Sequence, residues 1–150
     1  MPQSLASAYL HIVFSTKDRA LLIRSGFQDD LYGYIGSILR NRDCVLLSSG
    51  GTLDHVHLLV SLSRQASIAD VLRDIKSISS KWIHETQPDL TTFEWQRGYG
   101  VFSIRYSGVG KLSDYIRNQA EHHRVKTFKE ELIELLKEHD LDYDERYLWD

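Results

Sequence analysis

Two histidines, His55 and His57, stand one residue apart in the stretch DHVHLLV at residues 54–60. Successive side chains of a β-strand point to opposite faces, so in a strand both imidazoles lie on one face. The other face is then an apolar row of Val56, Leu58 and Val60. Two imidazoles on one face can bind one divalent metal ion, but two ligands are too few for a tight structural site. Taken alone, the pattern favours two surface histidines over a metal site.

A second group of reactive side chains stands in SDYIRNQAEHHR at residues 113–124, which we expect to be helical. Tyr115 and Gln119 are four residues apart and therefore share a helix face. A tyrosine can attack phosphorus once its phenol, with a usual pKa of about 10, is deprotonated or oriented. A nearby metal ion would polarise and orient a phosphodiester, and Gln119 could supply a neutral oxygen ligand. The ordinary alternative to these chemical roles is that Tyr115 packs against other side chains and that Gln119 is exposed to solvent.

Hydrophobic periodicity predicts the elements that position these residues. Alternating or short apolar runs predict four strands, at residues 8–16, 44–49, 55–62 and 99–107. Apolar residues at helical spacing predict a helix over 27–42 and a second one that begins after the capping pair Ser67 and Asp70. The order β-α-β-β-α-β predicts an α+β, ferredoxin-like fold, in which both helices cover one face of a four-stranded antiparallel sheet. We then expect the histidines on the open face, as an accessible platform with Tyr9 and His11 nearby.

The whole chain, residues 1–150, is expected to form one domain. Its predicted parts are a sheet core at about 1–107, a glycine hinge at about 107–111 and a tyrosine helix at about 111–124. A C-terminal helix and tail at 127–150 follow, opened by the capping pair Thr127 and Glu130.

The net charge of −3 hides a strong asymmetry. Residues 97–129 carry seven Lys and Arg against two acids, whereas residues 130–150 carry two against nine. The basic segment is typical of a chain that meets phosphate, although solvated helix faces explain the charges equally well. No apolar run approaches the roughly 20 residues that span a bilayer, and the single cysteine, Cys44, fits a reducing cytoplasm. We therefore expect a cytoplasmic protein without a membrane partner.

The order and spacing of several motifs resemble the small single-tyrosine transposases of the insertion-sequence two-hundred type. These belong to the HUH nuclease class, named for His, an apolar residue, His, and the REP-associated tyrosine transposases look equally similar. The motifs that carry the resemblance are YLHIVFSTKDR near the start, DHVHLLV, SSKWI (79–83), WQRGYGVFS (95–103), YIRNQ and ERYLW (145–149).

The resemblance implies a metal-dependent single-stranded DNA transposase. It implies that His55, His57 and Gln119 bind Mg²⁺ or Mn²⁺. Tyr115 would attack a phosphodiester, keep the 5′ phosphate and release a 3′ hydroxyl, which later attacks another phosphotyrosine. A homodimer that recognises DNA hairpins is also implied, with the Gly108–Gly110 stretch as a hinge that sends the tyrosine helix to an active site, often the partner's.

Five side chains are candidate DNA contacts: His11, Arg105, Lys111, Arg117 and Arg124. The main alternative to an enzyme is a non-catalytic or domesticated protein that holds nucleic acid on the open face of the sheet. A pure binding protein does not need the combination of two histidines with Tyr115 and Gln119. A two-histidine phosphoesterase would need a second histidine motif in another strand, and the sequence shows none.

Overall fold

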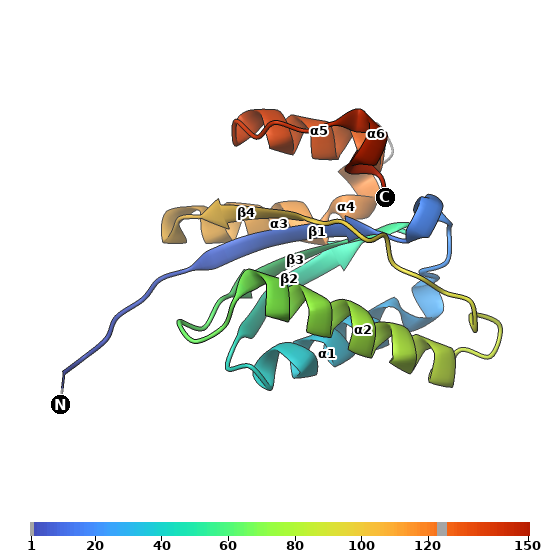
Figure 1. Ribbon diagram of the computed structural model, residues 1–150, viewed down its shortest axis with the longest axis horizontal. Coiled ribbons are helices and arrows are strands. Elements are labelled where there is room, and N and C mark those ends of the chain that lie inside the picture. The colour runs from blue at the N-terminus through green and yellow to red at the C-terminus, as the bar shows by residue number, and fades with distance from the viewer. Residues whose placement is uncertain (1, 123–125) are drawn as a thin grey trace.

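The structure is a computed structural model that describes residues 2–122 and 126–150. A four-stranded antiparallel sheet in the order β2-β3-β1-β4 forms its centre. The strands are Tyr9–Ser15 (β1), Val45–Gly51 (β2), His55–Ser61 (β3) and Gly100–Ile104 (β4). Helices α1 (Ser25–Arg40) and α2 (Ile68–Thr86) cover one face of this sheet (Figure 1). The predicted α+β, ferredoxin-like class is confirmed.

The C-terminal third of the chain lies on the other face of the sheet (Figure 1). Its elements are a 3-10 turn at Tyr106–Gly108 and the helices α3 (Val109–Arg117), α4 (Gln119–His122), α5 (Phe128–Glu138) and α6 (Glu145–Leu148). The molecule is therefore a three-layer structure, with the sheet enclosed between two sets of helices. In the described ranges, no helix is both long and apolar enough to cross a membrane.

The main core lies between the sheet and the pair α1 and α2. Leu10, Ile12 and Phe14 of β1 enter it together with Val56, Leu58 and Val60 of β3, as the alternation predicts. Helix α2 begins at the predicted cap, because the Ser67 side chain accepts a hydrogen bond from the backbone of Asp70. The apolar face of the His55–Ser61 strand is therefore the one that holds the fold together.

A second, smaller core fills the face that we expected to be open. Phe128, Leu132 and Leu136 project from α5 at intervals of four residues and pack against Val13 and Phe102 of the sheet. As a result, His55 and His57 are 0% exposed. The prediction of an accessible platform was wrong, because the apolar stripe of α5 and the apolar residues on this sheet face bury one another.

The segment that carries the tyrosine differs in two ways from the predicted hinge and single helix. Residues 107–111 form the end of the 3-10 turn and the first residues of α3, so the connection is helical in this structure. The helix then ends at Arg117, and α4 begins at Gln119. Asn118 breaks the helix, and its side-chain amide donates to the Asp114 carbonyl at 2.9 Å. This break turns Gln119 away from the simple helical continuation of α3.

Candidate active site

The tyrosine helix packs closely on the edge strand β2. Gly50 lies opposite His57 in the β2–β3 pairing, and a Cβ on Gly50 would overlap the backbone carbonyl of Ile116 in α3. Only glycine allows this close approach of helix and strand backbones. The distance between Tyr115 and the histidine strand is therefore fixed by a glycine next to the site.

Gly50→Ala is expected to push α3 outward and to displace the Tyr115 hydroxyl, since the obstructing atoms are backbone. We expect at least a tenfold loss in any reaction that Tyr115 carries out, because about 1 Å of misplacement costs about 10²-fold. Gly33→Ala is the matched control: Gly33 is exposed in α1, and a Cβ added there would meet nothing within 4 Å. It should raise the free energy of unfolding by about 0.5–1 kcal/mol and leave the site unchanged. Equal activities for the two variants would contradict the close-approach argument.

His55 is held from one side so that its other nitrogen faces the interior of the site. Its Nδ1 donates to Asp54 Oδ1 at 2.7 Å, and its ring stacks on Phe128 with centroids 4.8 Å apart. In the neutral tautomer that this bond selects, Nε2 is an acceptor that faces the Gln119 amide oxygen, also an acceptor, at 3.1 Å. Two acceptors that face one another are the arrangement that a cation stabilises.

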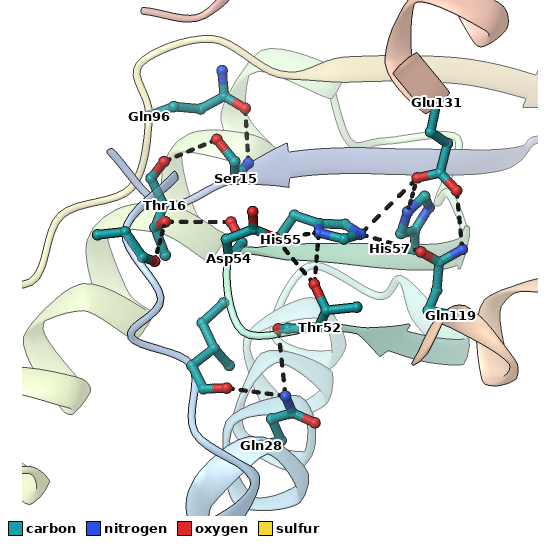
Figure 2. Close-up of polar contacts among 12 residues, drawn as sticks. Ser15, Thr16, Gln28, Thr52, Asp54, His55, His57, Gln96, Gln119 and Glu131 are labelled. Carbon is teal, nitrogen blue, oxygen red and sulfur yellow. Dashed lines mark hydrogen bonds and ion pairs between the residues drawn. The ribbon is translucent and has the colours of Figure 1, made fainter. Parts of the chain in front are cut away.

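His57 is braced by a second buried histidine. His11 Nε2 and His57 Nδ1 are 2.8 Å apart, and their rings stack at 5.0 Å. Burial, and then the neighbouring His57, lower the pKa of His11 to about 3, so His11 is neutral at physiological pH. The His57 Nε2 lies 2.8 Å from Glu131 Oε1. Both imidazoles therefore point Nε2 into the same small space (Figure 2).

Glu131 of α5 is the residue that sequence reasoning missed. It is 3% exposed, and its carboxylate contacts His57, Gln119 and Tyr115. In the sequence it stands in an acidic tail, where carboxylates are usually solvated. The available signal was its position: Glu131 stands between Phe128 and Leu132, on the apolar stripe of α5. A carboxylate on a buried stripe needs partners, and the site supplies them.

Tyr115 approaches the histidines from α3. It is half-buried, its ring centroid lies 6.0 Å from that of His57, and its hydroxyl donates to Glu131 Oε2. Burial, followed by the hydrogen bond and the negative charge of Glu131, raises the pKa of Tyr115 above its usual value of 10. The phenol is therefore protonated at neutral pH, and any attack by its oxygen requires a group that accepts the proton.

Comparison with known proteins places this site in a family. The family model described as "Transposase IS200 like" matches residues 4–119, which is most of the chain and includes His11, His55, His57, Tyr115 and Gln119 but not the α5 residues. The chain belongs to the IS200-like transposase family. No curated protein matches the sequence significantly.

Two solved structures share the fold of this IS200-like transposase. One is a protein assigned as a transposase from Deinococcus radiodurans, with a TM-score of 0.65 and 22% identity over 79% of this chain and 98% of that chain. The other is a REP-associated tyrosine transposase bound to a REP hairpin, with a TM-score of 0.56 and 16% identity over 77% and 68% of the two chains. At these sequence identities, the two comparisons show a shared fold and no more.

The transposase chain brings Tyr115, Gln119, His55 and His57 together by itself. In this single chain the tyrosine helix lies on its own sheet, and a helix that crosses to a partner stays a prediction for the homodimer. His11 is buried against His57, so its side chain is not available to DNA here, contrary to expectation. The side chains of Arg105, Lys111 and Arg117 are exposed, and Arg117 pairs with Asp114 at 2.8 Å. Arg124 lies outside the described residues.

The donor atoms of the site fit a divalent metal ion. Ligand atoms of His55, His57 and Glu131 all lie within 4.8 Å of one another, and the Gln119 oxygen faces the same space. The outer nitrogens of both imidazoles are held by Asp54 and His11, as metal-ligating histidines usually are. Two imidazoles with amide and carboxylate oxygens form a mixed donor set that could bind a metal ion.

Proposed function

We propose that this transposase is a metal-dependent enzyme that cuts and rejoins single-stranded DNA, with Tyr115 as its nucleophile. One observation carries the proposal. The Tyr115 hydroxyl, two imidazole nitrogens and the Gln119 amide oxygen meet in one enclosed site of a chain from the IS200-like family. Neither a packed tyrosine nor a pair of surface histidines requires this convergence.

The proposed ligands of the ion are His55, His57 and Gln119, and we expect Mg²⁺ or Mn²⁺ in the cell. A bound ion would polarise the scissile phosphodiester and fix its orientation. Asp54 and His11 keep the two imidazoles in position, since each contacts an outer ring nitrogen. The α5 residue Phe128 covers His55 and limits access of water.

Tyr115 performs the bond exchange. A bond forms between its oxygen and phosphorus while the bond from phosphorus to the 3′ oxygen breaks. The 5′ phosphate stays on Tyr115, and the 3′ hydroxyl is released. A 3′ hydroxyl then attacks the phosphotyrosine and restores the free phenol. Because each step replaces one phosphodiester by another, the reaction needs no nucleotide triphosphate.

The proposed substrate is a single-stranded DNA hairpin. The similar REP-associated transposase was solved with a REP hairpin, which supports this choice. Arg105 precedes the 3-10 turn and Lys111 lies in the first turn of α3, so both exposed cations flank the tyrosine helix. Exchange of two strands needs two tyrosines, so a homodimer remains our prediction for transposition.

Charge reversal tests the proposed DNA contacts. Arg105→Glu and Lys111→Glu should each weaken binding of a labelled hairpin roughly tenfold at low salt, because backbone phosphates dominate such binding. The slope of log K against log salt should fall by about 0.7 for each lost contact with a single strand. Lys81→Glu is the control, since Lys81 is exposed on α2, in the opposite layer. An equal effect of Lys81→Glu would indicate unspecific attraction to the whole chain.

A covalent adduct tests the function itself. Labelled single-stranded oligonucleotides that tile the DNA on both sides of the gene are incubated with the protein and Mg²⁺ or Mn²⁺. We expect an adduct that survives denaturing electrophoresis, a fragment with a free 3′ hydroxyl, and loss of both with a chelator. Tight hairpin binding without any adduct in either metal would instead favour a nucleic-acid-binding module.

A further inference from the structure

We propose that Tyr106 is a platform on which an unpaired base of the single-stranded DNA next to the hairpin stacks. This inference rests on the proposed function and names the part of the substrate that Tyr106 receives. Tyr106 opens the 3-10 turn Tyr106–Gly108, at the end of β4 where the chain turns into α3 (Figure 1).

The Tyr106 side chain is available to a ligand. The residue is 73% exposed, and within the described ranges its hydroxyl makes no hydrogen bond. The half-buried Tyr9 of β1 lies beside it, with ring centroids 5.9 Å apart and ring planes tilted by 47°. A nucleobase can therefore reach the Tyr106 ring, and every base has a flat π face that stacks on an aromatic ring.

The tyrosine pair lies on the same sheet face as the proposed active site. Side chains of β1 alternate, and His11 is on the face that carries His57, with ring centroids 5.0 Å apart. Tyr9 is two residues from His11, on the same face and about 7 Å away along the strand. A DNA strand that leaves the active site along β1 would therefore meet Tyr9 and Tyr106 next.

Two exposed cations flank Tyr106 and favour a nucleic acid as its ligand. Arg105 directly precedes it, Lys111 follows in the first turn of α3, and neither makes an ion pair within the part of the chain that the structure describes. The nearest acid along the chain, Asp114, is paired with Arg117 at 2.8 Å. Cations that track the backbone, next to an aromatic ring that stacks on a base, are typical of sites for single-stranded nucleic acid.

The exposed Tyr147 of α6 has a different environment. It is 65% exposed, and the Arg146 guanidinium lies 5.4 Å from its ring centroid. Arg146 is paired with Asp144 at 2.7 Å, in the acidic end of the chain. A phosphate backbone is not attracted there, because the cation is already neutralised. Tyr147 is therefore a matched control for Tyr106: similar exposure, without unpaired cations.

Tyr106→Ala tests the platform by removing the ring. We expect the affinity for a hairpin with an unpaired flank to fall by about 5–150-fold, the usual effect of losing one base–aromatic stack. Tyr106→Phe and Tyr106→Trp keep an aromatic face and should bind like the wild type, as should Tyr147→Ala. Thermal unfolding should be the same for all of these variants, because both tyrosines are exposed.

The salt dependence of binding separates stacking from charge. Tyr106→Ala should keep the wild-type slope of log K against log salt, because no phosphate contact is lost. Arg105→Glu should instead reduce the slope by about 0.7. A reduced slope in Tyr106→Ala would mean that the ring only positions the neighbouring cations, which would contradict the platform.

An abasic nucleotide, placed at each unpaired position in turn, identifies the base that stacks. At one position we expect the wild type to lose as much affinity as Tyr106→Ala loses with intact DNA. Tyr106→Ala should lose nothing more there, since both changes remove the same contact and their effects do not add. The fluorescent base 2-aminopurine at this position should be quenched on binding to the wild type and to Tyr106→Phe, but not to Tyr106→Ala.

Three further results would overturn the inference and leave the proposed function standing. Wild-type affinity in Tyr106→Ala would remove the platform. An equal loss in Tyr106→Phe would assign the effect to the hydroxyl. Additive losses at every unpaired position would show that Tyr106 contacts no base. A wild-type protein that binds no hairpin and forms no adduct would instead remove the proposed function, and the inference with it.

Discussion

Replacing Tyr115 with phenylalanine is expected to abolish the covalent protein–DNA adduct while hairpin binding persists. The change removes only the nucleophilic oxygen, and we expect cleavage to fall by more than about 10⁴-fold because no covalent route remains. The ring still packs against His57. Loss of the hydrogen bond to Glu131 should lower the free energy of unfolding by about 1.5–3 kcal/mol, the usual contribution of a hydrogen bond to a charged group.

Tyr32→Phe is the matched control for this variant. The Tyr32 hydroxyl is buried in α1 and has no hydrogen-bond partner among the described residues. Its removal should leave cleavage unchanged and stabilise the fold by about 1 kcal/mol, because an unpaired buried hydroxyl is costly. Thermal unfolding separates the two effects. A normal yield of adduct from Tyr115→Phe would place the nucleophile on another residue.

His57→Ala is expected to abolish both metal binding and cleavage. The change removes one of the two imidazole nitrogens that point into the site, the one that lies 2.8 Å from Glu131 Oε1 (Figure 2). Removing a residue that only hydrogen-bonds to a metal ligand typically weakens metal binding about 10–100-fold. Removing a ligand itself should therefore cost more than about 100-fold in Mn²⁺ affinity. Gln119→Ala should cost less, since a water molecule can replace a neutral oxygen ligand. Calorimetric titration with Mn²⁺ measures each loss without any DNA substrate.

His84→Ala controls for the loss of a histidine elsewhere in the chain. His84 lies near the end of α2 and contacts the Phe93 carbonyl at 2.8 Å. Its removal should lower the free energy of unfolding by about 1 kcal/mol, the usual contribution of one hydrogen bond, and leave the Mn²⁺ affinity unchanged. Unaltered Mn²⁺ affinity in His57→Ala, together with full cleavage in a chelator, would rule out the metal site.

The fold was accessible from the sequence because its strands and first two helices have clear periodicity. Strand β3 alternates between an apolar row and the two histidines, and the Ser67 cap marks the start of α2. The layer formed by α5 was not accessible in the same way. Periodicity identifies the apolar stripe of that helix, but it does not say which surface the stripe covers. The burial of His55 and His57 follows from that packing and could not be predicted locally.

The site could be predicted only in part, because some of its contacts are visible in local sequence patterns and others arise from tertiary packing. Tyr115, Gln119 and the two histidines could be singled out because their spacing in strand and helix is regular and matches a known family. Glu131 is distant in sequence from the histidines, and its acidic neighbours suggest solvent exposure. The contact between His11 and His57 depends on the pairing of β1 with β3, in which Val13 lies opposite His57. Such contacts belong to the tertiary structure, so only the folded chain reveals them.

Mapping the covalent adduct tests the central claim most directly. The wild-type protein is incubated with a hairpin oligonucleotide and Mn²⁺, the DNA is digested to the last nucleotides, and the peptides are analysed by mass spectrometry. We expect a single modified peptide, with the 5′ phosphate attached to the oxygen of Tyr115. A phosphate mapped to any other residue, or cleavage that proceeds with no protein-linked phosphate, would contradict the account.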